Sequence, residues 1–301
     1  MAIALGYIGV IVIWSTTPLT IKWSGESVGF LYGVSARMAL ALAVCLMIFA
    51  LIRKTLPMNK SARQSYIAAG LPLYSAMFAV YWAAQYIPSG MISVLFGLTP
   101  LFTGVFSVYI LKHNVFNRYS VLGMALGLGG LCIIFSRSLD IGENAVLGIT
   151  ATLIAVIIHS LSVVWVKRVS ANTPPLAVNT GALIIACSLY FATWLIGDYS
   201  LPAEVPLQAG LSIVYLAIFG SVCGALLFYY TLRKTSAAAM ALLTLITPVT
   251  ALIIGNQFND EVIHLNTLIG TSMIITALLI YYWPQLQAWL KEQMVGRRAG
   301  G

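Results

Sequence analysis

The amino-acid sequence predicts an all-α membrane protein with ten transmembrane helices, built as two inverted five-helix repeats. Hydrophobic residues make up 60% of its 301 residues and charged residues only 8%, whereas charged residues are about a quarter of a soluble domain. The apolar residues form blocks of about 18 to 25, a length that crosses a bilayer as a helix. One block also occurs twice, because 89–111 and 237–259 align at a spacing of 148 residues that places Pro100 on Pro248.

The apolar blocks predict the spanning helices in chain order. The first begins at the third residue without a basic leader or a cleavage site, so we expect it to be retained rather than removed as a signal peptide. Pro88 lies in the very short gap before the fourth block and is tolerated there, because the first residues of a helix do not need an N–H. The predicted spans are 3–21, 31–52, 65–86, 89–111, 120–136, 146–166, 177–197, 208–231, 236–256 and 263–283.

Basic residues favour one set of the loops between these spans. Most Lys and Arg residues lie in loops that share a side with both termini, whereas the loops of the other side contain only Lys22 and Arg137. Positively charged loops remain in the cytoplasm. We therefore expect a multi-pass protein of the cytoplasmic (inner) membrane with both termini in the cytoplasm.

The first two spans contain the first candidate residues. Pro18 removes the hydrogen bond to the carbonyl of Trp14, and Ser15 beside it offers a hydroxyl at membrane depth. We expect Trp14 and Ser15 to bind substrate and Pro18 to act as a hinge, with a packing kink as the alternative for the proline. Arg37 in the second span leaves two interpretations open: contact with a substrate carboxylate, or snorkelling of its long side chain to the interface.

The third span carries an aromatic face. Its members follow one another at helical spacing, whereas a lipid-facing stripe is expected to be aliphatic away from the interfaces. The pattern therefore indicates a wall of a substrate cavity, with ordinary bundle packing as the alternative. The aromatic residues of this face are Tyr74, Phe78, Tyr81 and Trp82.

Prolines at matching positions mark the fourth and ninth spans. Pro100 and Pro248 leave the carbonyls of Phe96 and Thr244 without a helical donor. An unpaired carbonyl is costly in lipid, so each is expected to face a cavity or a partner helix. We predict that both prolines are hinges or gates and that Thr244 binds substrate, with packing kinks as the alternative.

Small and polar residues characterise the fifth, sixth and seventh spans. Gly123, Gly127 and Gly130 predict close packing of the fifth helix. His159 is an ionisable residue at membrane depth, which makes it a candidate functional residue; a neutral histidine bonded to a neighbouring helix is the alternative. Asn179 is a candidate substrate-binding amide, although a bond between helices would also explain it.

The starts of the two halves correspond as well. Trp14 and the serine after it match His159 and the serine after it at a spacing of 145 residues. Five spans separate them, and because five is odd the halves have opposite orientations. Inverted repeats of this kind place the substrate near the midplane. The predicted domains are residues 1–140, residues 141–284 and a cytoplasmic tail, 285–301.

Motifs for cofactors are absent from the sequence. The four cysteines lie in separate apolar blocks without C-x-x-C spacing, and there is no G-x-x-x-x-G-K-[ST] loop for a nucleotide. The predicted spans also lack Asp and Glu, so no carboxylate proton relay is available. We expect no cofactor, no metal and no ATP, and transport by alternating access with His159 as the one candidate for proton coupling.

Several features occur together along residues 3–283. They are Trp14 with its serine, Arg37 followed by small and aliphatic residues, the two Thr-Pro spans, and Glu261 ahead of the span that contains Gly270. Together they resemble the drug/metabolite transporter superfamily, specifically EamA-type ten-helix exporters, and are most similar to amino-acid exporters of the YddG type. The resemblance implies an inner-membrane exporter of small metabolites, in particular amino acids including aromatic ones.

The sequence departs from this family pattern at two places. Lys112-His113 occupies the first-half position that corresponds to Asp260-Glu261 in the second half, so whatever the acidic residue does for packing or capping is asymmetric. His159 stands where the family often has an apolar or aromatic residue.

Two alternatives to amino-acid export remain. A sugar phosphate would need several buried cations, and Arg37 is the one cation within the spans; drug-like compounds stay open as well. A remote alternative is an intramembrane Ser/His hydrolase, but Ser160 points about 100° away from the adjacent His159 on a helix and no nucleophile elbow is present. We expect no enzyme activity, a small-molecule substrate and the lipid bilayer as partners, and no nucleic acid; the sequence is compatible with a monomer.

Overall fold

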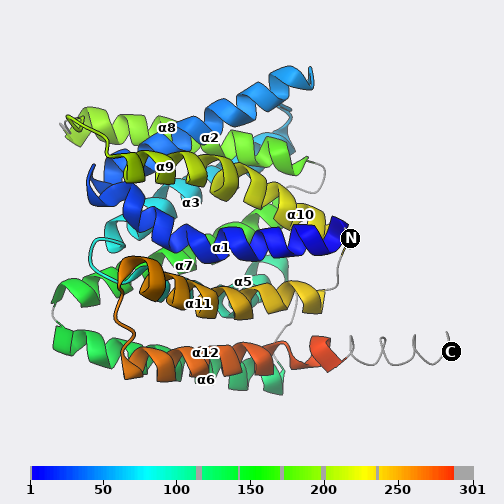
Figure 1. Cartoon of the computed structure of the whole chain (residues 1–301). Coiled ribbons are helices and arrows are strands. Elements are labelled where there is room, and N and C mark those ends of the chain that lie inside the picture. The colour runs from blue at the N-terminus through cyan, green and yellow to red at the C-terminus, as the bar shows by residue number, and fades with distance from the viewer. Residues whose placement is uncertain are drawn as a thin grey trace.

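The structure is a computed structural model that describes residues 2–112, 117–141, 143–169, 173–197, 201–234 and 237–287. The regular elements of these residues are all helices, and they run side by side as one bundle (Figure 1). The N-terminus and the last described residues lie at the same end of the bundle (Figure 1). We call this the terminal end and the other the far end.

The helices follow the predicted spans closely. In the first half they are α1 (Ala2–Glu26), α2 (Phe30–Leu51), α3 (Lys60–Ala83), α4 (Ser89–Phe96), α5 (Thr99–Leu111) and α6 (Arg118–Ile141). In the second half they are α7 (Glu143–Val169), α8 (Pro175–Gly197), α9 (Leu207–Tyr215), the π-helix η1 (Leu216–Cys223), α10 (Gly224–Lys234), α11 (Ala237–Asn259) and α12 (Leu265–Tyr281).

Eight helical stretches among the described residues are long and apolar enough to cross a membrane. The helix Leu265–Tyr281 is apolar but shorter. It coincides with the predicted tenth span, and α11 coincides with the predicted ninth; both run beside the longer helices (Figure 1). The eight long stretches are Leu5–Glu26, Phe30–Leu51, Lys60–Ala83, Ser89–Leu111, Arg118–Ser136, Asn144–Val169, Pro175–Gly197 and Leu207–Phe228.

The predicted fourth span is not one continuous helix. α4 ends at Phe96 and α5 begins at Thr99, so Pro100 lies in the first turn of α5 and not inside a helix, where its missing N–H costs little. Pro248, by contrast, lies within the unbroken α11. The difference has a local cause: Gly97 precedes the first Thr-Pro pair, whereas Leu245 holds the matching position in α11, and glycine is a much weaker helix former than leucine.

The predicted eighth span contains a π-helix that the sequence analysis missed. Residues Leu216–Cys223 adopt this wider turn between two α-helical segments. π-helical turns are rare and often mark functional sites.

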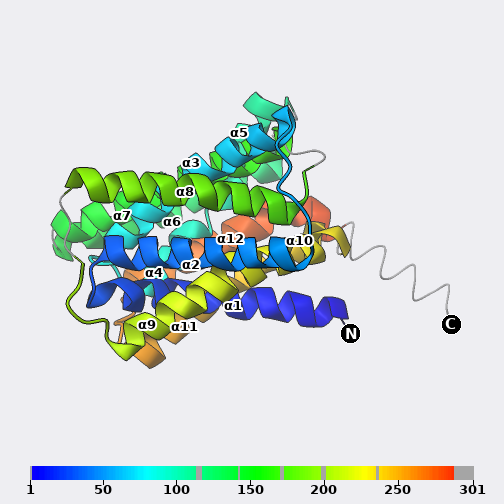
Figure 2. The same cartoon turned by 90° about the horizontal axis from the view of Figure 1, so that it is seen from above.

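The packing partners of the helices recur in pairs. α1 packs against α11 and α10, and α7 packs against α5 and α3. α4 packs on α11, α3 on α8, and α2 on both α8 and η1. Viewed from above, α2 and α8 lie side by side across the bundle (Figure 2).

Glycines bring α6 and α12 together at one flank. A Cβ atom on Gly130 would lie 2.7 Å from the carbonyl oxygen of Gly270, and one on Gly123 would lie 2.7 Å from that of Ala277. Because Cβ atoms do not approach a backbone oxygen so closely, these positions require glycine. The close packing predicted for the fifth span is therefore confirmed.

Candidate functional site

The aromatic face of α3 meets α2 and α8. The Tyr74 hydroxyl shares a hydrogen bond of 2.7 Å with Thr193, and its ring lies 4.7 Å from that of Tyr190. The Tyr190 hydroxyl donates to the Tyr74 carbonyl at 3.0 Å. The ring of Phe78 packs edge-on against Phe30 at 5.2 Å. Tyr74 and Phe78 are half-buried, so their rings form an aromatic wall that is partly accessible.

Tyr81 and Trp82, the other two aromatic residues of this face, do not belong to that wall. Tyr81 is 1% exposed, and its hydroxyl accepts hydrogen bonds from Ser24 and Arg37, each at 3.4 Å. Trp82 packs on Tyr86, with ring centroids 4.8 Å apart, near the far end of α3. Tyr81 is thus a buried partner of Arg37, whereas Trp82 has the position of an interface aromatic.

Arg37 does not snorkel to the interface. It is 5% exposed, and its Nε donates to the Ser221 hydroxyl at 3.0 Å across to η1. Asn179 holds the same π-helix, because its side-chain amide donates to the Ser221 carbonyl at 3.0 Å. Asn179 therefore has a defined structural partner, and Ser221 joins the site through its hydroxyl and its carbonyl.

Trp14 and Ser15 point to different neighbours. The Trp14 ring lies 5.1 Å from that of Phe228 on α10 and is half-buried. Ser15 is 3% exposed and shares a hydrogen bond with the Thr250 hydroxyl on α11. Ser15 thus connects two helices. Pro18 is buried within α1, which continues through it without a break.

His159 is exposed and its ring contacts α4. Its ring lies 5.9 Å from that of Phe96, the last residue of α4, and α4 is buried over all its other residues. On α7, the exposed Ile154 and Trp165 share one face, and His159 lies about 140° further round the helix. Val163, one helical turn further along the same face of α7, is exposed as well. His159 is thus an ionisable side chain at membrane depth that contacts Phe96 at the end of α4.

The Thr-Pro segments are held by serines from neighbouring helices. The Ser160 hydroxyl donates to the Thr99 carbonyl at 3.3 Å and to the Val156 carbonyl at 2.7 Å. The Ser93 hydroxyl donates to the Thr247 carbonyl at 3.4 Å. Ser160 is therefore engaged with backbone carbonyls, which does not fit a nucleophile. Thr244, one turn before Pro248, is half-buried in α11.

Glu261 connects three helices at the far end. Its carboxylate accepts the backbone N–H of Ser89 at 2.9 Å, the Ser89 hydroxyl at 3.0 Å and the Gly90 N–H at 3.2 Å. These N–H groups belong to the first turn of α4, where a helix lacks partners and favours negative charge. Lys22 of α1 pairs with the same carboxylate at 3.6 Å.

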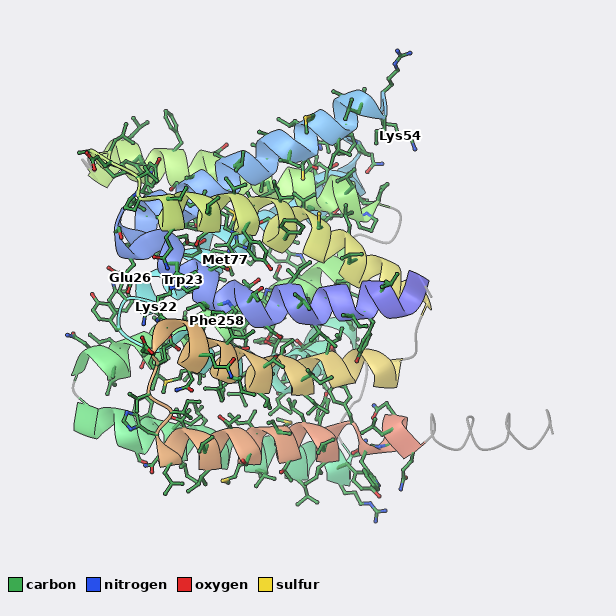
Figure 3. All side chains as sticks on the ribbon, viewed as in Figure 1. Lys22, Trp23, Glu26, Lys54, Met77 and Phe258 are labelled. Carbon is green, nitrogen blue, oxygen red and sulfur yellow. The ribbon has the colours of Figure 1, made fainter. Side chains whose placement is uncertain are left out.

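A second contact reinforces this junction. The indole N–H of Trp23 donates to the Asn259 side chain at 2.9 Å, and Figure 3 shows Lys22, Trp23 and Phe258 gathered at the far end. The sequence pointed to Glu261 through Asp260-Glu261, but the helix that it caps lies 172 residues earlier. We call Lys22, Ser89, Gly90 and Glu261 the far-end clasp.

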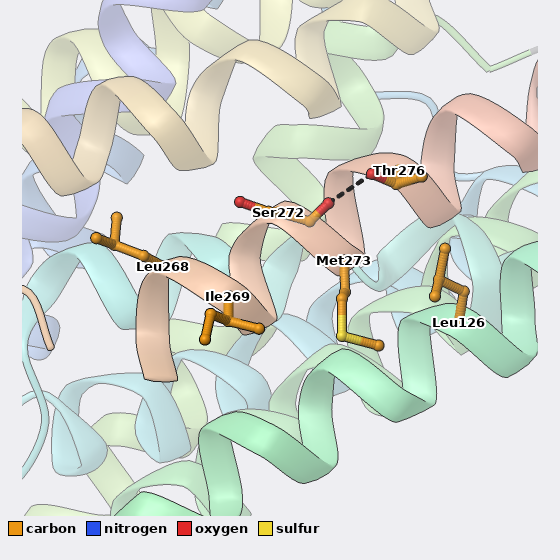
Figure 4. A pocket seen from close by; sticks show the side chains of 6 residues that line it. All are labelled: Leu126, Leu268, Ile269, Ser272, Met273 and Thr276. Atoms are coloured by element: carbon orange, nitrogen blue, oxygen red, sulfur yellow. Dashed lines mark hydrogen bonds between the residues drawn. The ribbon is translucent and has the colours of Figure 1, made fainter. Parts of the chain in front are cut away.

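Two surface hollows lie away from the predicted site residues. A groove of about 370 Å³ between α6 and α12 is lined by Leu126, Leu268, Ile269, Ser272, Met273 and Thr276 (Figure 4). A smaller hollow of about 180 Å³ at the far end borders the Glu261 side chain, Pro88 and His264. Neither contains any of the residues predicted to bind substrate.

The sequence profile of the EamA-like transporter family matches residues 1–136 and, a second time, residues 146–283. The chain belongs to the EamA-like transporter family. It is therefore a multi-pass membrane protein of a transporter family, as the resemblance in its sequence implied. The repetition of the match, once in each half, corresponds to the repeat of the apolar spans.

Relatives of this EamA-like transporter are transporters by description. The uncharacterized transporter YoaV of Bacillus subtilis is 24% identical over 92% of this chain and 96% of its own length. The uncharacterized inner membrane transporter YedA of Escherichia coli is 26% identical over 89% of this chain and 87% of its own. A solved crystal structure shares the fold, with a TM-score of 0.64 and 18% identity over 93% of this chain and 97% of the other.

Proposed function

We propose that this EamA-like transporter exports small metabolites, in particular amino acids including aromatic ones, across the inner membrane. The observation that carries the substrate class is the half-buried aromatic wall of Tyr74 and Phe78 inside a bundle of apolar helices. Aromatic rings offer favourable contacts to an apolar or aromatic side chain. The engagement of Lys22 by Glu261 also disfavours a sugar phosphate, which calls for several free cations.

The proposal includes ten spans in two inverted repeats, residues 1–140 and 141–284, followed by a tail, 285–301. The helix pairings support it. At the repeat spacing, α1 on α11 corresponds to α7 on α5, and each pair is tied by the equivalent serine, Ser15 in one and Ser160 in the other. Such exchange of partners is what a two-fold axis between the halves produces.

Alternating access without ATP, metal or other cofactor completes the proposal. The far-end clasp joins α1, α4 and the end of α11 through hydrogen bonds and an ion pair, and the Trp23 indole adds a hydrogen bond to Asn259 beside it. These observations support a conformation that is closed at the far end. A rocking motion of one repeat against the other would open it.

Transport by the purified protein in proteoliposomes tests the substrate class. We expect labelled phenylalanine, tyrosine or leucine to exchange against unlabelled amino acid faster than in protein-free liposomes. A sugar phosphate and a cationic drug serve as competing substrates in the same vesicles. Background rates for every amino acid, together with flux of one of these competitors, would contradict the proposal.

A further inference from the structure

Arg37 is a permanent charge buried in the bundle without a counter-ion. It lies about 10 Å along α2 from the start of that helix, and its guanidinium is a cation that carries hydrogen-bond donors and no acceptor. A buried charge is expected to be paired. The one ion pair formed within the described residues joins Lys22 to Glu261, so no carboxylate of that part of the chain neutralises Arg37.

The contacts of Arg37 leave several donors unused. Nε donates to Ser221 and Nη1 to Tyr81, whereas a guanidinium offers five N–H groups. Nη2 has no hydrogen-bond partner in the described residues. The fully buried side-chain atoms without a partner in that part of the chain are the hydroxyl oxygens of Thr99 and Thr271, and Nη2 is not one of them. Nη2 is therefore a donor that the described residues leave without an acceptor.

The hydroxyls around Arg37 increase the excess of donors. Tyr81 accepts from both Arg37 and Ser24, and Ser221 accepts from Arg37. The single hydrogen of Ser24 is also donated to the Ile21 carbonyl, at the shorter distance of 2.8 Å. The Ser221 hydroxyl accepts from the cation and has no acceptor for its own hydrogen among the described residues. A cluster in which hydrogens outnumber acceptors around a cation is suited to an anion.

The π-helix lies next to Nη2. A Cβ atom at Gly220 would lie 3.3 Å from Nη2, so a side chain at this position would crowd the guanidinium. Asn179 fixes the adjacent turn through the Ser221 carbonyl. The planar edge that remains matches the two oxygens of a carboxylate, while the presence of a single cation argues against a doubly charged phosphate.

We propose that Arg37, with the hydroxyls of Tyr81 and Ser221, binds the carboxylate of the transported solute. This inference rests on the proposed function and narrows it, because it makes a carboxylate the required group and leaves the amino group optional. The aromatic wall begins two helical turns away on α3, at Tyr74 and Phe78, and offers contacts for the apolar part of the same solute.

Four phenyl compounds test the requirement without any substitution. Phenylalanine carries both groups, 3-phenylpropanoate only the carboxylate, phenethylamine only the amine, and phenylalaninamide replaces the carboxylate by an amide. Competition for transport, or thermal stabilisation of the purified protein, ranks their affinities. We expect the two carboxylates to bind about tenfold or more tightly than the other two, as for loss of a hydrogen bond to a charged group. Equal affinity of the acid and its amide would overturn the inference, as would tighter binding of phenyl phosphate.

Substitutions then assign the effect to Arg37. Arg37→Gln is expected to weaken carboxylate binding about tenfold to a hundredfold and to remove the preference for acid over amide. Arg63→Gln, which neutralises an exposed arginine on α3, is the matched control and is expected to keep the preference. A folded Arg37→Gln protein with unchanged affinity for the acid contradicts the assignment. If this variant does not fold, Tyr81→Phe and Ser221→Ala are each expected to weaken binding of the acid and not binding of the amide. An unchanged preference for the acid over the amide in both variants would overturn the inference.

The outcomes separate this inference from the proposed function. Arg37-dependent binding of 3-phenylpropanoate without transport of any amino acid would keep the carboxylate site and reject amino-acid export. Transport of amino acids and their amides at equal affinity would keep the exporter and reject the site.

Discussion

Buried polar side chains of this protein fall into two groups. Ser15, Ser93 and Ser160 are used up in contacts between helices, as expected where lipid offers no hydrogen-bond partners. Arg37 and its hydroxyl neighbours keep unused donors. The first group explains how the helices are held together, and the second is the group from which we propose the carboxylate site.

Glu261 is expected to stabilise the fold through its contacts to α4 and Lys22. Glu261→Gln removes the charge and turns an N–H donor toward the N–H groups of Ser89 and Gly90. We expect a loss of about 2 kcal/mol, measured as a lower Tm of the purified protein. Glu26→Gln changes an exposed carboxylate on α1 and is the control. Equal Tm values for the two variants would show that the clasp contributes little.

His159 is expected to contact the solute path. His159→Ala removes an exposed ring that contacts Phe96 and makes no hydrogen bond within the described residues. Transport should therefore fall about tenfold while the amount of protein in the membrane stays the same. Ser162 on the same helix donates to the Ala68 carbonyl, and Ser162→Ala is expected to reduce stability rather than flux. Wild-type flux in His159→Ala would make this histidine structural.

At the scale of elements, the two Thr-Pro segments are not equivalent. Thr99-Pro100 lies at the break between α4 and α5, whereas Thr247-Pro248 lies within the continuous helix α11. The break also leaves the Thr99 hydroxyl buried without a partner, a cost of about 1–3 kcal/mol that a rearrangement of this segment would relieve. A segment of this kind suits a hinge better than an intact helix does.

Substitution of the prolines tests this asymmetry. Pro100→Ala restores an N–H at the break and is expected to slow turnover more than it weakens binding, because the helix can then close across Gly97. Pro248→Ala, in the unbroken α11, is also expected to slow turnover, but by less than Pro100→Ala does. Transport kinetics in proteoliposomes measure the two effects separately, because slower turnover lowers kcat and weaker binding raises KM. Wild-type kinetics in both variants would end the hinge interpretation.

The contact of α6 with α12 depends on glycine at one position and not at its neighbour. Gly130→Ala would place a Cβ atom 2.7 Å from the backbone oxygen of Gly270, and neither backbone can yield without separating the helices. Gly129→Ala meets only the end of the flexible Met273 side chain at 3.1 Å. We expect Gly130→Ala to lower the Tm by several degrees, about 1–3 kcal/mol, and Gly129→Ala to leave it nearly unchanged. A reversed order would contradict the packing.

At the scale of the whole molecule, the bundle is fastened at its far end by the clasp. The clasp draws on α1, α4 and the residues after α11, and so it ties both halves of the chain together. Opening this end requires these contacts to break, which is how the proposed alternating access would use them.

The orientation of the bundle follows from its charges. Because most basic loops lie at the terminal end, that end is expected to face the cytoplasm. Green fluorescent protein fused to the C-terminus should fluoresce, and alkaline phosphatase at the same place should be inactive because its disulfides do not form in the cytoplasm. Phosphatase inserted near residue 203, in the loop before α9, should be active. The opposite pattern would invert the topology.

Sequence alone was enough for the class of fold. Block length and composition predicted helices that cross a membrane, and matching blocks predicted a repeat that the family profile also finds in each half. Gly130 predicted a close helix contact because only one physical property, the lack of a side chain, decided it. The aromatic face of α3 was also visible from its spacing, although spacing did not separate Tyr81 from Tyr74.

Tertiary structure decided which residues meet. In a membrane, lipid and protein neighbours are equally apolar, so the pattern along a helix does not say which of its faces is covered or by what. The sequence therefore left Arg37 open between contact with a substrate carboxylate and snorkelling, and snorkelling was excluded only when Ser221, 184 residues later, was placed beside it. Glu261 likewise became the cap of α4 only through folding, because the backbone N–H groups that it accepts have no signature in the sequence.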